Sequence, residues 1–322
     1  MLPQGAMRWS LIPMFIVLFA LTLCHDQAMC AGSGVKVKPL YRLANFSGVV
    51  PYSRVSLAVD PNSNELLVLD PQKGDISIFN DVGMEVYRTG SYRDLGFPVD
   101  LAVRKDGAID LLMRDEQHYV IRRCNYRGEP VSVMELQEVP EDFSDMRPNK
   151  ILWRSGLLYV VDTYSLRVTV FDSDGRYKRG YTLADVLELD EKEASENAIF
   201  GFTVDGEGSL LFTIPTLFSV YRVSPEGKVE TFGEAGSSPG KFSIVSGIAV
   251  DGEGYIYLSD RNRSVIMIYS PDLKFRHEFG FRGFGPGGLI IPRDLDVDGN
   301  GTVYVAQMGR RGIKAFSVTV AH

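Results

Sequence analysis

The sequence has few of the residues that build disulfides, catalytic zinc sites or serine-hydrolase centres. It contains three cysteines and four histidines in 322 residues. Two of the cysteines, Cys24 and Cys30, lie near the start, so a chain without its first 30 residues keeps Cys124 alone and can form no intrachain disulfide. We expect Cys124 to be a small core residue. No shared zinc site is expected, because His277 falls in a predicted outer strand and His322 is the last residue, and no Gly-x-Ser-x-Gly nucleophile motif is present.

Long apolar runs are also scarce, and the clearest one spans 13 residues, 11–23. A run of that length is too short to cross a membrane as a helix. Arg8 precedes it, and small residues such as Ala28 and Ala31 follow. This order predicts a secretory signal over residues 1–30, a periplasmic or secreted protein, and no transmembrane segment after cleavage. The alternative is a lipoprotein acylated at Cys24.

The charge balance is acidic, with a formal net charge of −7. An acidic, exported chain is a poor candidate for nucleic-acid binding. Without a disulfide, the mature chain must be held together by its own core, and about 290 residues suffice for one large all-β domain. We expect a monomer.

A hairpin pattern recurs along the chain. Residues 156–175, GLLYVVDTYSLRVTVFDSDG, contain two runs rich in β-branched residues around an Asp-led turn, which predicts two paired strands. The turn residue and a buried residue nine positions later occur six times, at intervals of 45, 47, 52, 46 and 47 residues. The six pairs are Asp70 and Phe79, Asp115 and Cys124, Asp162 and Phe171, Ile214 and Val223, Asp260 and Tyr269, and Gln307 and Phe316. Because Asp stands at four of these turns, we assign it to local turn capping.

A strand repeat of this length predicts a propeller blade. Each unit has an apolar inner strand before the hairpin and a further strand after it, so each blade is a four-stranded antiparallel meander. The last unit lacks its fourth strand, and residues 37–43 have the alternation to supply it. We therefore predict an all-β, six-bladed β-propeller over residues 35–322, closed by the N-terminal strand.

The repeats resemble the NHL family of six-bladed propellers. The resemblance rests on YVVDTYSLRVTVFDSDG (159–175), GEAGSSPGKFSIVSGIAVDGEGYIYLSDRNRSVIMIYS (233–270) and FGPGGLIIPRDLDVDGNGTVYVA (284–306). It covers nearly the whole mature chain, but Ile214-Pro215 replaces the Asp turn in the fourth unit. The family includes binding and scaffolding domains and a few metal-dependent enzymes, so the resemblance leaves the function open.

One face of the predicted propeller should carry the Asp-type turns and the loops between blades. Basic and aromatic residues in these segments form a candidate partner-binding rim. They are Lys73, Tyr164, Arg167, Phe218, Arg261, Arg263, Arg310 and Arg311. The same face should hold an acidic insertion, residues 183–198, with a spacing typical of a short amphipathic helix. That insertion could cap the channel, bind a basic partner, fold onto the arginines or simply be solvated.

Polar residues are also expected around the propeller axis, where the inner strands begin. Asp100, Asn149 and Asp294 are the candidate ligands of a metal there, and Ca²⁺ accepts such oxygen ligands. The set is similar to the axial metal site of lactonase-type propellers, although those sites also use a Glu that is not evident here. The alternative is a polar ring that binds water.

Two functions follow from these candidates. The first is an exported binding or scaffolding module that docks a protein, peptide or glycan on the basic rim, without chemistry or cofactor. The alternative is a Ca²⁺-dependent hydrolase or lactonase-like enzyme with its metal at the axis.

Overall fold

The hairpin at residues 156–175 forms as its β-branched runs predict. The computed structural model describes residues 34–89, 96–115 and 118–321. In it, β13 (Leu157–Asp162) and β14 (Arg167–Phe171) pair antiparallel, with Leu158 opposite Phe171 and Asp162 opposite Arg167. All but the first residue of each strand is buried, which is the burial expected for strands inside a propeller blade.

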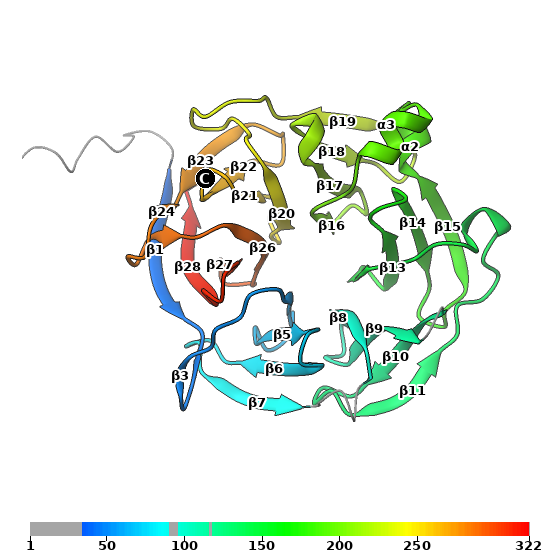
Figure 1. The fold of residues 1–322 in the computed structure, drawn as a ribbon, viewed down its shortest axis with the longest axis horizontal. Coiled ribbons are helices and arrows are strands. Elements are labelled where there is room, and N and C mark those ends of the chain that lie inside the picture. Colours follow the sequence, from blue (N-terminus) through cyan, green and yellow to red (C-terminus); the bar gives the residue numbers. More distant parts are fainter. Residues whose placement is uncertain (1–33, 90–95, 116–117, 322) are drawn as a thin grey trace, which may run out of the picture. The chain divides into compact units, whose positions relative to one another are not determined.

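Within the described residues, the strands form six four-stranded sheets arranged around a ring (Figure 1), which confirms the predicted six-bladed propeller. The first three sheets comprise β4 (Ser56–Val59), β5 (Leu66–Asp70), β6 (Asp75–Phe79) and β7 (Glu85–Thr89); β8 (Pro98–Val103), β9 (Ile109–Asp115), β10 (His118–Cys124) and β11 (Pro130–Met134); and β12 (Lys150–Arg154), β13, β14 and β15 (Tyr177–Thr182). The next two comprise β16 (Phe202–Val204), β17 (Leu210–Ile214), β18 (Ser219–Val223) and β19 (Val229–Phe232); and β20 (Val245–Val250), β21 (Ile256–Asp260), β22 (Val265–Tyr269) and β23 (Phe275–Phe279).

The sixth sheet joins the two ends of the described chain. It contains β26 (Pro292–Val297), β27 (Thr302–Gln307), β28 (Ile313–Val320) and β1 (Val35–Arg42). β1 pairs with β28, so the first strand lies beside the last (Figure 1) and the predicted closure by the N-terminal strand is confirmed. This pairing covers the outer edge of β28, which would otherwise present unpaired backbone groups.

Short elements occupy the loops. Two small ribbons pair β2 (Ala44–Asn45) with β3 (Gly48–Val49) and β24 (Phe281–Arg282) with β25 (Gly288–Leu289). The 3-10 turns are η1 (Glu141–Phe143) and η2 (Pro215–Leu217). The acidic insertion contains α2 (Leu183–Val186) and α3 (Glu191–Glu196), two short helices where one was predicted. None of the helices in the described residues is long and apolar enough to span a membrane.

The core lies between neighbouring sheets, where the residues nine positions after each turn pack. Phe79, Phe171, Val223 and Phe316 are at most 1% exposed, and Cys124 occupies the equivalent place in the second sheet at 2%. Burial raises the pKa of the Cys124 thiol to about 11, so it stays protonated near neutral pH. This confirms Cys124 as a core residue. Burial of each large apolar side chain contributes about 1.5–3 kcal/mol to the stability of the fold.

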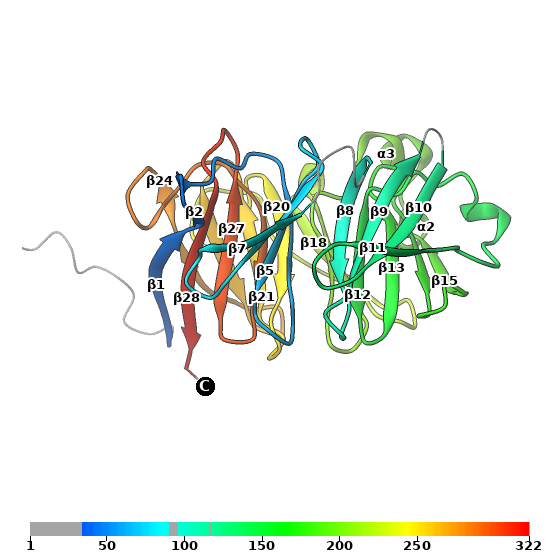
Figure 2. The same cartoon turned by 90° about the horizontal axis from the view of Figure 1, so that it is seen from below.

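The turns between the second and third strands lie on the same side of the ring as the loops that lead into each inner strand. We call this side the upper face; it is at the top of Figure 2, where α3 also lies. At the three predicted positions whose side chains are described, Asp70, Asp162 and Asp260, the carboxylate caps the turn, as predicted. Asp162 accepts hydrogen bonds from the backbone N–H groups of Tyr164, Ser165 and Arg147 at 3.1, 3.1 and 2.8 Å, and Asp260 caps the fifth turn in the same way.

The predicted signal at 1–30 and Cys24 lie outside the described residues.

Candidate functional site

A cavity of about 610 Å³ opens at the centre of the upper face, and we call it the mouth cavity. The starts of the inner strands and the loops between sheets form its wall. Arg54 comes from the loop before β4, Arg261 from the turn between β21 and β22, and Arg293 from β26. Tyr164, 75% exposed, and Phe200, 48% exposed, contribute aromatic surface to the same wall.

The three arginines of the mouth cavity form no ion pair with a carboxylate of the described residues. Among the ion pairs of the described residues, none involves Arg54, Arg261 or Arg293. The Arg261 guanidinium lies 5.7 Å from the centre of the Phe200 ring and donates to the Met308 sulfur at 3.7 Å. Burial, and then the charges of Arg293 and Arg54, lower the pKa of Arg261. The lining also includes Asp100 and Asp294, beside Lys150, so the cations outnumber the carboxylates, which favours an anionic ligand at the arginines.

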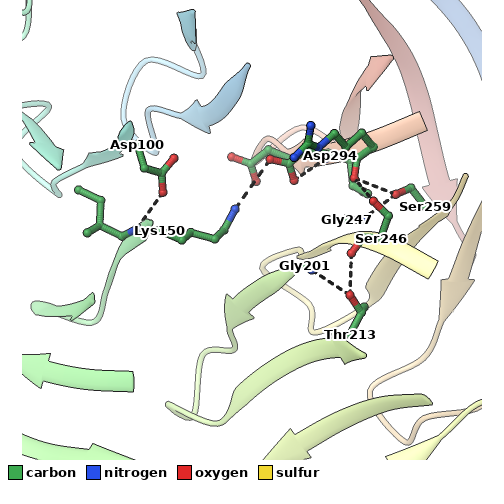
Figure 3. A network of polar contacts seen from close by, with 12 residues as sticks. Asp100, Lys150, Gly201, Thr213, Ser246, Gly247, Ser259 and Asp294 are labelled. Carbon is green, nitrogen blue, oxygen red and sulfur yellow. Dashed lines mark hydrogen bonds and ion pairs between the residues drawn. The ribbon is translucent and has the colours of Figure 1, made fainter. Parts of the chain in front are cut away.

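A cationic side chain, that of Lys150, also lies at the axis and lines the mouth cavity. The Lys150 ammonium, at the start of β12, is 3.8 Å from the Asp294 carboxylate (Figure 3). Burial alone would lower the pKa of Lys150, but the carboxylates of Asp294, Asp100 and Asp296 raise it above its ordinary value. Asp100 is 4% exposed, and its carboxylate accepts a hydrogen bond from the Ile151 N–H at 2.8 Å. Its pKa is raised by burial, although Lys150 opposes this.

The strand register places Lys150, rather than Asn149, level with Asp294. Lys150 pairs with Val161 and Asp294 pairs with Ala306, each one residue before the equivalent turn residues Asp162 and Gln307. Asn149 lies one residue earlier. Its side-chain amide donates to the Thr163 hydroxyl at 2.7 Å, and its carbonyl accepts from the Thr163 N–H at 3.2 Å.

These contacts decide how well the axis fits a calcium ion. Calcium takes six to eight oxygen ligands, several of them anionic. Here an ammonium group stands beside the Asp294 carboxylate, the Asn149 amide is already paired, and the described residues contain no group of three or more His, Cys, Asp or Glu that could hold a metal. The side chains as arranged do not fit this ion.

On one side of the axis, a backbone-rich network closes the wall (Figure 3). The Thr213 hydroxyl donates to the Ser246 carbonyl at 2.7 Å, and the Ser246 hydroxyl donates to the Arg293 carbonyl at 2.6 Å. A Cβ on Gly201 would lie 2.2 Å from the Ser246 carbonyl oxygen, so only glycine allows this approach. The network holds the backbone of Arg293 in place, and thus one of the three arginines of the mouth cavity.

A second cavity of about 280 Å³ continues below Lys150 and is also lined by Asp100, Asp294 and Asp296. Asp296 accepts hydrogen bonds from the N–H groups of Val59 and Val297, both at 2.9 Å. Burial raises the pKa of Asp296 to about 6, although these hydrogen bonds oppose the shift. The axis therefore carries opposite charges close together, while the mouth above it is dominated by cations.

The structure separates the residues of the predicted rim into groups. Tyr164 and Arg261 line the mouth cavity, and Phe218 lines a neighbouring groove. Ion pairs neutralise three others: Lys73 with Asp70 at 3.1 Å, Arg167 with Asp145 at 2.6 Å and Arg263 with Glu278 at 2.7 Å. Arg310 lies in the turn between β27 and β28, and Arg311 stacks on Phe284, with 4.6 Å from guanidinium carbon to ring centre.

The insertion at 183–198 positions part of the mouth cavity. Its Leu183 is fully buried, and after α3 the chain leads to Ala198, Ile199 and Phe200 in the cavity wall. Among the described residues, its carboxylates form one ion pair, between Glu196 and Lys192 of the same helix. The insertion thus packs against the core of the third and fourth sheets and carries its charge outward.

Sequence reasoning missed Arg54, Arg293 and Lys150. Arg293 and Lys150 are immediate neighbours of the predicted axial positions 294 and 149, so the signal was present but assigned one residue away. A one-residue shift in a strand moves a side chain to the opposite face. Arg54 lies in a loop, where no strand pattern predicts its direction.

No family model matches the chain, and no curated protein matches it in sequence. Solved structures do share its fold. A protein of unknown function from Bacteroides thetaiotaomicron has a TM-score of 0.63 and 15% identity, covering 88% of this chain and 76% of that one. A streptogramin B lyase has a TM-score of 0.61 and 12% identity, covering 88% of this chain and 98% of that one. A gluconolactonase from Xanthomonas campestris has a TM-score of 0.56 and 11% identity, covering 88% and 90%.

Identities this low show a shared fold only. The resemblance to NHL repeats is thus not supported by a family model. What the structure and its neighbours establish is an all-β, six-bladed propeller, similar in fold to a streptogramin B lyase and to a gluconolactonase.

Proposed function

We propose that this protein is a binding module that captures an anionic group of its partner or ligand in the mouth cavity. The observation that supports the proposal is the unpaired arginine set, Arg54, Arg261 and Arg293, around one cavity of about 610 Å³. Guanidinium groups match carboxylate, phosphate and sulfate oxygens with paired hydrogen bonds. Holding three such groups together without a counter-ion costs free energy, and a bound anion would remove that cost.

The proposal narrows the predicted basic rim. Lys73, Arg167 and Arg263 form ion pairs with carboxylates of this chain, so their charge is already partly balanced. Arg261 and Tyr164 remain as rim residues of the site, and Arg54 and Arg293 join them. A protein, peptide or glycan bearing acidic groups could dock there, and rigid presentation of the loops would suffice for binding without chemistry.

The test uses citrate, a compact tricarboxylate, as the probe. We expect isothermal titration to show citrate binding to the intact chain, and binding to weaken at least tenfold in the double variant Arg261→Ser and Arg293→Ser. Arg310→Asn is the control, because it removes a charge from the same face outside the cavity, at a positive φ of 60° that Asn tolerates. Equal citrate affinity in the wild type and the double variant would refute the proposal.

The second candidate is a Ca²⁺-dependent hydrolase or lactonase-like enzyme. It is favoured by the carboxylates of Asp100 and Asp294, which line both cavities, and by the gluconolactonase among the structural neighbours. The Lys150 ammonium opposes it for the reason given above. Melting the purified protein with and without EDTA tests it directly: no shift, together with no calcium by elemental analysis, would remove this candidate.

Export is also a proposal, because residues 1–30 lie outside the described part of the chain. The intact mass of protein recovered from the periplasm or medium would separate cleavage near residue 30 from acylation at Cys24.

A further inference from the structure

A second hollow adjoins the mouth cavity on the upper face, between the fourth and fifth sheets, and we call it the apolar groove. Its volume is about 580 Å³. It shares Phe200 and Arg261 with the mouth cavity, so the two hollows meet where the Arg261 guanidinium stacks on the Phe200 ring. The groove therefore begins at the arginines and leads away from the axis.

The lining of the apolar groove exposes four large apolar side chains. Phe200, Phe218, Ile244 and Ile291 are 48%, 41%, 40% and 39% exposed. Scattered apolar residues are normal on a protein surface, but several lining one hollow indicate a site that binds apolar groups. Pro215 extends this surface, and no Asp or Glu belongs to the lining.

Two of these side chains are held in an unfavourable backbone conformation. Phe218 has φ of 51° and Ile291 has φ of 48°, in the left-handed region. This region disfavours bulky residues and is especially rare for a β-branched one such as Ile291. At Phe218 the conformation belongs to the turn itself, because Leu166 and Ser264 at the equivalent positions are also left-handed. Ile291 is 39% exposed, so burial does not explain its conformation, and strained residues commonly cluster at functional sites.

The groove arises where the fourth sheet departs from the repeat. In three of the other described turns an Asp carboxylate caps the turn, at Asp70, Asp162 and Asp260, and the sixth turn has Gln307 at this position. The fourth has Ile214-Pro215 instead, and the chain makes the 3-10 turn η2 (Pro215–Leu217) before Phe218. Pro215 and Phe218 of this turn line the groove.

The polar edge of the groove is cationic. Besides Arg261, Arg282 belongs to the lining and donates to the Asn262 carbonyl at 2.9 Å. No ion pair among the described residues involves Arg282. Apolar floor, cationic edge and the adjoining arginine set thus form one continuous surface that complements a molecule with an anionic head and an apolar arm.

We infer that the ligand is a small amphipathic anion, an inference that rests on the proposed function. Its oxyanion head binds Arg54, Arg261 and Arg293 in the mouth cavity, and its apolar arm lies in the apolar groove against Phe200, Phe218 and Ile291. Guanidinium groups donate hydrogen bonds to carboxylate and sulfate groups alike, so we define the head group only as an oxyanion. The arm supplies affinity through burial of its methylene groups.

Titration calorimetry with acetate, octanoate, octyl sulfate and octanol tests this inference on the full propeller. We expect octanoate to bind more tightly than acetate, by about fourfold for each methylene that is buried. Octanol, which lacks the charge, should bind much more weakly than octanoate. A preference between octanoate and octyl sulfate would identify the oxyanion.

Two pairs of variants separate the head from the arm. Phe218→Asn and Ile291→Asn suit the left-handed conformation, so the fold should persist while the chain-length dependence falls and citrate binding stays unchanged. Arg261→Ser with Arg293→Ser should weaken citrate and octanoate together. If octanoate binds no more tightly than acetate while citrate still requires the arginines, the amphiphile is wrong and the proposed function stands. If the arginine substitutions leave the affinity for citrate unchanged, the proposed function itself fails. A short apolar peptide with a free carboxylate that binds where octanoate does not would also overturn the inference.

Discussion

The ammonium nitrogen of Lys150 lies 3.8 Å from Oδ2 of Asp294, on the axis of the ring, and Asp100 contributes a further carboxylate to the same level. This pair belongs to the lining of both cavities, so it divides the axis into an upper and a lower space. The carboxylates near the axis depend on Lys150 for neutralisation, because burial alone penalises their charged forms.

We expect Lys150→Met to lower the free energy of unfolding near neutral pH by about 3 kcal/mol, since it leaves buried carboxylates without a partner. Urea unfolding measures the change. The double variant Lys150→Met with Asp294→Asn is the control and should recover part of the loss. Equal destabilisation of the single and double variants would show that Lys150 acts through packing instead of charge.

The raised pKa of Asp296 predicts that the stability of the protein depends on pH. Its folded pKa, about 6, exceeds the usual value of 3.8 for an unfolded Asp, so the native state binds a proton more tightly than the unfolded state. Stability from this group is present at low pH and is lost as pH rises from about 4 to about 6.

The variant Asp296→Asn should abolish this part of the pH dependence. The difference in unfolding free energy between wild type and variant should change by about 2 kcal/mol across that interval. Asp251, whose pKa burial also raises, is present in both proteins and cancels. A difference that stays constant with pH would contradict the assigned shift.

Arg261 and Arg263 stand two residues apart, but their substitution by alanine should affect the stability of the protein differently. Arg263 binds the Glu278 carboxylate through two hydrogen bonds of 2.7 and 2.9 Å and donates to the Lys241 carbonyl at 2.8 Å. We expect Arg263→Ala to cost about 3 kcal/mol, because it leaves the partly buried Glu278 carboxylate without its cation and with the Gly240 N–H as its remaining donor. Arg261→Ala should leave stability unchanged or raise it slightly, because Arg261 repels Arg293 and Arg54. Thermal melts of both variants check this, and a comparable loss in the two would contradict the view that Arg261 is held for binding.

The closing strand offers a matched pair on its two faces. In β1, Val37 lies opposite Val318 and packs against the core between the fifth and sixth sheets, whereas Lys38 points outward and is exposed. We expect Val37→Ser to destabilise the propeller by about 1–2 kcal/mol and Lys38→Ser by less than about 0.5 kcal/mol. Denaturant midpoints give both values. If the two substitutions have the same effect, β1 contributes backbone pairing alone.

The fold was largely predictable because its signals are local. Alternation of apolar residues identified the hairpin at 156–175, and its repetition identified six sheets and the unpaired last strand that β1 completes. The role of Asp162 as a turn cap followed from residue type and spacing, and its hydrogen bonds confirm it. The second helix of the insertion was not predicted, since its capping box, Asp190 with Glu193, is a short local pattern in a strongly charged segment.

The candidate site was predictable only in part. Arg167 and Arg263 resembled Arg261 as basic residues in equivalent turns, but their carboxylate partners, Asp145 and Glu278, stand 22 and 15 residues away along the chain. The axial residue of the third sheet was predicted at Asn149, whereas the strand pairing places Lys150 level with Asp294.

The sequence by itself determined the architecture of this protein: strand periodicity and turn chemistry act over a few residues, and their repetition requires a closed ring. The tertiary structure alone decided which charges remain available. Arg54, Arg261 and Arg293 come from three loops and strands far apart along the chain and meet in one cavity. Arg263 is neutralised by Glu278 of its own sheet, whereas the three arginines come from different sheets, and the distances between them exist only after the ring has closed.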